Sequence, residues 1–304
     1  MIYRFHELTD DDRRQLHAFL KTHRPDDDQS YEDNMAYLGG ELFENGANVL
    51  IEIEEERIAG CIGVITREIP VKGEAYLVRF HVESESRPVA ARLLKLAAEV
   101  CEAHQAARIL AGIAPTDAFV GRFVREHGFD ERHRALVLSM DLAASKAPPF
   151  RREGELTYRR VDENSRGEYQ TLHNDVFRFV PNGGAVTDVE MEELIAKHAA
   201  SPDLLGVVYR GDRLIGFHEL ELIGDEGWIH AVGIDPACQG RGYGRELLDD
   251  LIARLGRMGA RCVKLVVMSN NVAAIGLYRA IGFREERVLS IWYGREIGDE
   301  ESSA

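Results

Sequence analysis

The sequence predicts an α/β protein, of the α+β kind, made of two consecutive domains with the same order of elements. Its 304 residues suit two domains, because single domains average roughly 150 residues. Apolar runs typical of buried strands alternate with segments whose leucines recur at helical spacing. Gly282-Phe283 follows Gly128-Phe129 by 154 residues, and the segments before each pair come in the same order.

The composition is that of a globular protein. Hydrophobic residues make up 45% and charged residues 29% of the chain, which is ordinary usage. The formal net charge of −15 disfavours nucleic acid and anionic lipid, and no apolar run reaches the roughly 18 residues of a membrane span. The first residues lack the basic-then-apolar order of a signal peptide. We therefore expect a cytoplasmic protein with no nucleic-acid or membrane partner.

The cysteines point to a reducing compartment. Cys61, Cys101, Cys238 and Cys262 are far apart and form no C-x-x-C motif. This spacing argues against both a zinc site and a disulfide framework. We expect no bound metal.

A proline pair near the middle of the chain marks the expected domain boundary. The segment 143–149 is rich in alanine and ends in Pro148-Pro149, which disfavour helix before them and remove two backbone donors. We expect a first domain over residues 1–145 and a second over 154–297. The small and acidic residues 298–304 are expected to fray.

The second half has the clearer pattern of elements. We expect, in chain order, strands over 213–222 and 228–234, a helix over 246–257, and strands over 262–268 and 286–293. Before the last strand, Asn270 or Asn271 can cap a further helix. Gly282 ends that helix at a position that favours left-handed backbone.

The first half repeats these positions with small changes in spacing. Three further pairs of segments correspond: 57–60 with 213–216, 74–77 with 226–229, and 93–94 with 247–248.

A glycine-rich loop between a strand and a long helix is the strongest chemical signal. Gly240, Gly242 and Gly244 alternate with other residues and let the backbone approach a ligand closely. Free amides and the dipole at a helix start favour an anion, and Arg241 and Arg245 add positive charge. The loop matches neither the Walker A motif nor the dinucleotide-binding G-x-G-x-x-G motif.

The spacing Gln239-x-x-Gly242-x-Gly244 resembles the pyrophosphate loop of the GNAT superfamily of acyl-CoA-dependent N-acyltransferases. The strand that ends before the loop, and the segment from Asn271 through Tyr278 to Phe283, resemble the family's neighbouring motifs. The resemblance covers residues 155–295. With the internal repeat, it implies two tandem GNAT-like domains, each a mixed, mostly antiparallel sheet flanked by helices.

The resemblance implies acetyl-CoA as the cosubstrate. It implies that backbone groups of Val232, Gly233 and Ile234 pair with the pantetheine arm, and that Asn271 lies near the cofactor. The pyrophosphate would be held by the amides of Gln239, Gly240, Arg241, Gly242, Tyr243, Gly244 and Arg245.

The implied reaction, attack of an amine on a thioester, needs one group that removes a proton and one that protonates the leaving thiolate. Tyr278 matches the family tyrosine beside the CoA sulfur and is the expected acid. From its spacing alone, Tyr278 is an aromatic on the core face of a helix.

His230 is the leading candidate for the base, because it lies on the strand that leads into the loop. An imidazole, with an ordinary pKa of about 6.5, transfers protons near neutrality. A hydrogen-bonded structural histidine is the alternative. Glu219 and Glu221 share one face of the preceding strand and are the reserve candidates for the base and for contact with the substrate. A solvated strand face is the alternative.

The acceptor pocket is expected along the helical stretch 168–198. Asn174 and Phe177 are candidates for its lining, and they equally suit a helix surface and a hydrophobic core.

The first half departs from the family pattern at the site. Its segment 83–91 has no glycine and contains Glu83, Glu85 and Pro88. At the 154-residue offset, Val124 stands for Tyr278 and Asp117 for Asn271. We expect this domain to keep the fold without binding CoA. The second half is similar to GNAT domains of the mycothiol-synthase type. Proteins of that type keep the loop in both halves, whereas this chain lacks it in the first half. We therefore do not assign their substrate to this chain.

The sequence thus predicts an N-acetyltransferase that transfers acetyl from acetyl-CoA directly to a primary amine of a small molecule. The alternatives are an enzyme that acetylates a protein or peptide amine and a non-catalytic acyl-CoA-binding regulatory module. A homodimer is compatible with the sequence.

Overall fold

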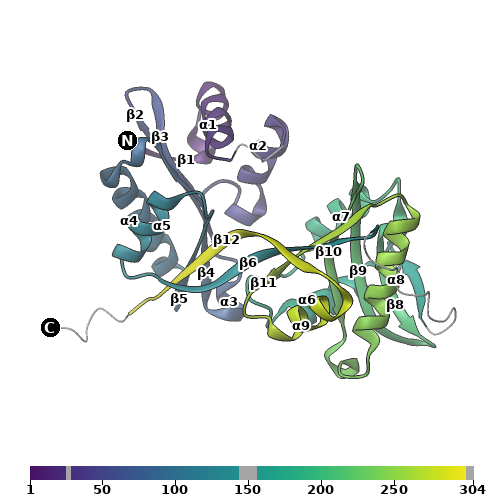
Figure 1. Cartoon of the computed structure of the whole chain (residues 1–304). Coiled ribbons are helices and arrows are strands. Elements are labelled where there is room, and N and C mark those ends of the chain that lie inside the picture. Colours follow the sequence, from purple (N-terminus) through teal and green to yellow (C-terminus); the bar gives the residue numbers. More distant parts are fainter. Residues whose placement is uncertain (25–28, 144–155, 299–304) are drawn as a thin grey trace. The chain divides into compact units, whose positions relative to one another are not determined.

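The computed structural model describes residues 1–24, 29–143 and 156–298 (Figure 1). The chain forms two compact units, unit 1 (Met1–His133 with Ser290–Ala304) and unit 2 (Arg134–Leu289). Most of the expected linker 143–149, the expected boundaries at 145 and 154, and the end of the chain after residue 298 lie outside the described residues.

Unit 1 has a mixed sheet with the strand order β1-β2-β3-β4-β5-β12. These strands are β1 (Ile2–Arg4), β2 (Val49–Glu54), β3 (Arg57–Ile65), β4 (Glu74–Val82), β5 (Arg108–Ile113) and β12 (Arg284–Glu296). The helices are α1 (Asp10–His23), α2 (Tyr31–Gly39), α3 (Ile69–Lys72), α4 (Arg87–Ala103) and α5 (Ala118–Glu126). The β4–β5 pair is parallel and the other pairs are antiparallel.

Unit 2 has the strand order β6-β11-β10-β9-β8-β7. These strands are β6 (Asp130–Asp141), β7 (Thr157–Arg160), β8 (Leu205–Arg210), β9 (Arg213–Ile223), β10 (Glu226–Ile234) and β11 (Cys262–Met268). The helices are α6 (Arg166–Phe177), α7 (Asp188–Lys197), α8 (Tyr243–Arg257) and α9 (Val272–Ile281). Only β10 and β11 pair in parallel among these described strands.

Helices cover both faces of the sheet in unit 2 (Figure 1). On one face, the leucines of α8 and Ile275 of α9 form a core with Ile229 of β10. On the other face, Tyr169 of α6 and Met191 of α7 pack with Phe217 of β9. None of the helices in the described part of the chain has both the length and the hydropathy to cross a bilayer.

The predicted α/β fold and its internal repeat are confirmed. The order from β3 through β4, α4, β5 and α5 recurs as β9, β10, α8, β11 and α9. Asp117 accepts a hydrogen bond from the Val120 amide at the start of α5, and Asn271 does the same for Ala274 at the start of α9. Gly128 and Gly282, at the ends of these helices, have φ angles of +80° and +125°.

The compact units differ from the two halves of the sequence in their last strands. β6 closes the first half of the chain but pairs with β11 in unit 2. β12 closes the second half but pairs with β5 in unit 1. Each of the two strands comes directly after a helix and a Gly-Phe pair. Because the two segments are this similar, the internal repeat does not indicate which sheet each strand joins.

Candidate active site

In unit 2 the parallel strands β10 and β11 stay paired along only half of β10. Their pairing covers Glu226 to Ile229, whereas β10 pairs with β9 on its other side as far as Ile234. Within the described residues, no strand pairs with the second edge of β10 from residue 230 to 234. Main-chain groups need hydrogen-bond partners. This edge, which includes Val232 and Gly233, therefore suits an extended amide-bearing chain such as a pantetheine arm.

His230 occupies a β-bulge at the point where β10 leaves β11. The register between β9 and β10 shifts between Ile229 and Ala231, so His230 is the extra residue. Bulges redirect side chains and are frequent beside active sites. His230 Nε2 lies 2.7 Å from Glu221 Oε2, and the imidazole stacks on Trp228 with 6.1 Å between ring centroids.

Glu219 and Glu221 lie on the same face of the sheet as His230. Leu220 between them belongs to the core under α8, so the two glutamates point to the other face. Lys197, at the end of α7, places its Nζ 3.0 Å from Glu221 Oε2 and 3.6 Å from Glu219 Oε1. We call Lys197, His198, Glu219, Glu221 and His230 the acceptor-face cluster.

The carboxylates of the acceptor-face cluster are held in their ionised form. Burial acts to raise the pKa of Glu219, but a hydrogen bond with His198 Nε2 at 3.4 Å and the charges of His230 and Lys197 outweigh it, so this pKa is lowered. Burial also acts to raise the pKa of Glu221. The hydrogen bond from Lys197 and the contact with His230 lower it below its usual value.

The glycine-rich loop leads into a helix start that no side chain caps. Gly240 and Gly242 have φ angles of +73° and +86°, a conformation that strains residues with a side chain. In the described structure, the amides of residues 240–244 donate to no protein acceptor, and α8 has no capping side chain. Gln239 Nε2 donates to the Ile234 carbonyl at 2.9 Å and closes the loop. These amides and the helix dipole suit a phosphate group, and we call the amides of residues 240–244 the anion cradle.

The basic residues around this helix start differ in their engagement. Arg245 Nε lies 3.7 Å from Asp249 Oδ2. Arg241 is exposed and forms no ion pair among the described residues. Tyr243 carries the Arg210 guanidinium over its ring at 4.6 Å. Arg241 is thus the arginine with the greatest freedom to meet an anion.

Tyr278 lies on the α8 face of the sheet, opposite the acceptor-face cluster. It packs against the core that contains the α8 leucines, and its ring meets Phe283 edge-on at 5.9 Å between centroids. A Cβ on Gly244 would lie 3.5 Å from Leu277, so α9 packs against the first turn of α8. Burial raises the pKa of Tyr278 to about 12, and the phenol therefore keeps its proton at neutral pH.

Asn174 and Phe177 hold structural positions on α6. Asn174 Oδ1 accepts from the Val186 amide at 2.8 Å, and its Nδ2 donates to the Val186 carbonyl at 3.2 Å. Phe177 stacks on the buried His173, with 4.5 Å between ring centroids. These contacts fix the connection from α6 to α7. Their expected role in lining an acceptor pocket stays a prediction.

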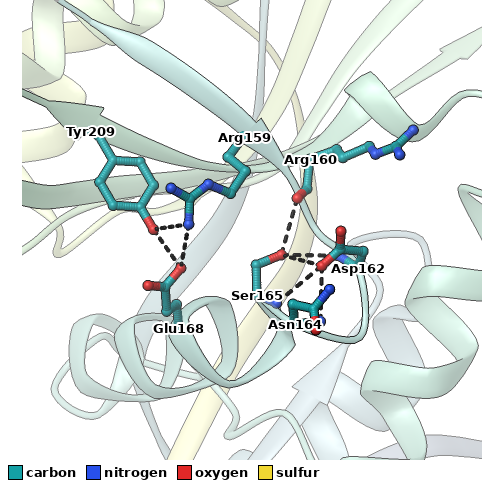
Figure 2. A network of polar contacts seen from close by, with 7 residues as sticks. All are labelled: Arg159, Arg160, Asp162, Asn164, Ser165, Glu168 and Tyr209. Carbon is teal, nitrogen blue, oxygen red and sulfur yellow. Dashed lines mark hydrogen bonds and ion pairs between the residues drawn. The ribbon is translucent and has the colours of Figure 1, made fainter. Parts of the chain in front are cut away.

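A polar network ties the edge of the sheet to α6 (Figure 2). Tyr209 on β8 donates its hydroxyl to Glu168 on α6, and Arg159 on β7 places its Nη1 3.7 Å from the same carboxylate. Asp162 accepts from the Asn164 and Ser165 amides at 2.9 and 3.1 Å. The network turns the chain from β7 into α6 and so sets the position of the helix that carries Asn174.

In unit 1 the parallel strands β4 and β5 also separate before their ends, but this unit lacks an anion cradle. β4 pairs with β5 only as far as Leu77 but with β3 as far as Val82. A short 3-10 helix, Glu83–Glu85, and Pro88 replace the glycine-rich loop. Val124, at the position of Tyr278, is fully buried in the core.

Comparison with known proteins identifies the class of domain. Residues 169–283 match the model of the Acetyltransferase (GNAT) family. The match covers the part of the second half in which the loop, Tyr278 and the acceptor-face cluster lie.

Solved structures show the same fold over nearly the whole chain. A GCN5-related N-acetyltransferase from Sphaerobacter thermophilus superposes with a TM-score of 0.68 at 17% identity, and the match covers 97% of this chain and 95% of that one. A tandem GNAT protein from the clavulanic acid biosynthesis pathway superposes with a TM-score of 0.64 at 12% identity, with 97% of each chain covered.

Curated relatives are mycothiol acetyltransferases. The protein from Geodermatophilus obscurus is 31% identical over 177 residues, which are 55% of this chain and 58% of the relative. The protein from a Nocardioides species is 32% identical over 177 residues, 52% of this chain and 60% of the relative. The chain thus matches less than two thirds of the length of these relatives.

Proposed function

We propose that this protein transfers an acetyl group from acetyl-CoA to a primary amine of a small molecule, and that unit 2 carries the reaction. The observation that carries the proposal is the opening between β10 and β11, with an anion cradle at its end and proton-transfer groups on its two faces. The match of residues 169–283 to the GNAT family supports acetyl transfer.

The two faces divide the chemistry of direct transfer. The amides of residues 240–244 would hold the pyrophosphate, and the free edge of β10 would hold the pantetheine arm. His230, oriented by Glu221 at 2.7 Å, would take a proton from the acceptor amine as it attacks the thioester carbonyl. Tyr278 would donate its proton to the departing thiolate from the opposite face. Each proton transfer is worth about 10²–10⁴-fold in rate.

The acceptor-face cluster supports an amine acceptor. An alkylamine is mostly a cation at pH 7, and Glu219 and Glu221 present two ionised carboxylates beside His230. Lys197 already places an ammonium group between them at 3.6 and 3.0 Å. The geometry of the pair therefore suits a primary ammonium group, and an acceptor that displaces Lys197 would bind there before it loses its proton.

Replacing His230 by glutamine is expected to lower kcat/KM by about 10²-fold or more and to change the pH dependence of kcat/KM, because the variant cannot accept the amine proton. Rates measured from pH 5 to pH 9 test this. The exposed His104 of unit 1, changed to glutamine, serves as the control. An unchanged pH profile would move the base to Glu219 or Glu221.

We expect one acetyl-CoA molecule to bind per chain, in unit 2. Glu83 and Glu85 stand where the second unit has its glycines, and two carboxylates repel a pyrophosphate. Calorimetric titration of the full chain with acetyl-CoA measures the stoichiometry. Two equivalent sites per chain would show that unit 1 also binds the cosubstrate.

A further inference from the structure

A cavity lies in unit 2, apart from the residues of the proposed acetyl-transfer site. Its volume is about 590 Å³, within the range of roughly 300–1,000 Å³ that small-molecule sites occupy. β7, the segment 200–206 and the last turns of α8 surround it. It shares no lining residue with the glycine-rich loop, the acceptor-face cluster or Tyr278.

Arg254 of α8 forms a fixed cationic wall of this cavity. Its guanidinium lies over the Tyr158 ring at 4.7 Å, and its Nη1 donates to the Asp203 carbonyl at 2.7 Å. The Tyr158 hydroxyl donates to Asp250 at 2.8 Å and holds the ring in place. Among the described residues, Nε and Nη2 of Arg254 have no acceptor, so a held guanidinium keeps donors for a ligand.

Arg160 of β7 adds a second positive charge. Ser165 donates its hydroxyl to the Arg160 carbonyl at 3.1 Å, and Figure 2 shows the Arg160 side chain extending away from that contact. Its guanidinium forms no ion pair within the part of the chain that the structure describes. Arg159 also lines the cavity but is engaged by Glu168. Asp203 is the acidic residue in the lining, so positive charge prevails.

His218 leaves an unsatisfied polar atom in the wall. The side chain is buried, with 1% of its surface exposed. Its Nε2 lies 3.2 Å from the Asp203 carbonyl, whereas the buried Nδ1 has no hydrogen-bond partner. Burial lowers the pKa of His218 to about 4, so the ring is neutral near pH 7. Its Nε2 also lies 3.5 Å from Arg254 Nη1. Buried polar atoms without a partner, such as Nδ1, are rare in folded proteins and call for an explanation.

We propose that this cavity binds a small organic anion, a carboxylate or a phosphate ester, whose oxyanion is held by Arg254 and Arg160. The cavity is too large for an inorganic ion alone, and Leu204 and Met258 offer apolar surface for a carbon body. On a chain with a net charge of −15, this local positive wall selects for an anion.

Calorimetric titration of the full chain with 4-hydroxybenzoate, 4-hydroxyphenyl phosphate and inorganic phosphate tests the proposal. We expect one saturable site per chain for at least one of the two organic anions, and weaker binding of inorganic phosphate. Tighter binding of the carboxylate or of the phosphate ester identifies the chemical source of the oxyanion.

Variants locate the site. Arg254→Gln is expected to weaken binding at least tenfold and Arg160→Gln at least threefold. Arg257→Gln, on the same helix but outside the cavity, should leave the affinity unchanged. Because Arg254 also supports Tyr158, the Arg160 variant decides the matter if Arg254→Gln fails to fold. Absence of binding by both organic anions, or equal affinity in the wild type and the Arg160 variant, would overturn the proposal.

Discussion

Replacing Tyr278 by phenylalanine is expected to lower kcat for acetyl transfer by about 100-fold or more, with little change in KM for acetyl-CoA. The variant keeps the ring that packs against Phe283 and removes only the proton that would go to the thiolate. General acid catalysis is worth about 10²–10⁴-fold. Steady-state release of free thiol from acetyl-CoA measures the effect.

The pH dependence of kcat gives a second test of Tyr278. Burial raises the pKa of its phenol to about 12, above the ordinary value of about 10. The acid form therefore persists through the mildly alkaline range, and Tyr278 should cause no loss of kcat there. Tyr293→Phe, in the core of unit 1, is the matched control. An unchanged kcat in Tyr278→Phe would show that another group protonates the thiolate.

Replacing Gly242 by valine is expected to weaken acetyl-CoA binding more than 100-fold. The residue has a φ of +86° at the start of α8, where a β-branched side chain is strained. The backbone would rotate away from this conformation, and the amides of the cradle would no longer converge on one anion. Calorimetric titration with acetyl-CoA measures the loss.

The control for Gly242 has the same strain at a remote place. Gly211, between β8 and β9, has a φ of +59°. A Cβ would meet no atom within 4 Å at either glycine. A difference in acetyl-CoA affinity between the two variants would therefore not come from a steric clash of the new Cβ. Gly211→Val should lower the thermal stability and leave acetyl-CoA affinity unchanged. Normal affinity in Gly242→Val would mean that the loop does not hold the pyrophosphate.

Local patterns predicted most of unit 2. The strand expected over 262–268 is β11 with the same bounds, and β9 extends one residue beyond 222. Asn271, one of the two expected caps, accepts from the Ala274 amide. The helix expected from residue 246 begins earlier, at Tyr243, because Gly242 completes the turn and the residues after it are free to be helical.

The exchange of β6 and β12 could not be predicted in this way. The choice of sheet depends on pairing with strands more than 100 residues away, such as Leu138 of β6 with Leu265 of β11. The alternation of hydrophobic residues indicates which face of a strand is buried. It does not indicate which copy of an internal repeat supplies the strand that pairs with it.

The candidate site was partly visible in the sequence. Its loop and Tyr278 belong to two separate motifs of the second half, and His230 lies on the strand that precedes the loop. Lys197 and His198 escaped notice, because their contacts with Glu219 and Glu221 cross more than 20 residues of chain and depend on where the end of α7 lies. The bulge at His230 was also missed, since a register shift follows from strand pairing rather than from local residue type.

The most direct test of acetyl transfer by unit 2 is a screen of primary amines with the full chain and acetyl-CoA, read by mass spectrometry of the products. Small amines and peptides with free amino termini or lysines belong in the same screen. We predict an N-acetylated small amine that forms only with acetyl-CoA and is lost in Gly242→Val. Acetylation of peptides alone, or binding of acetyl-CoA with no acetylated amine, would contradict the account.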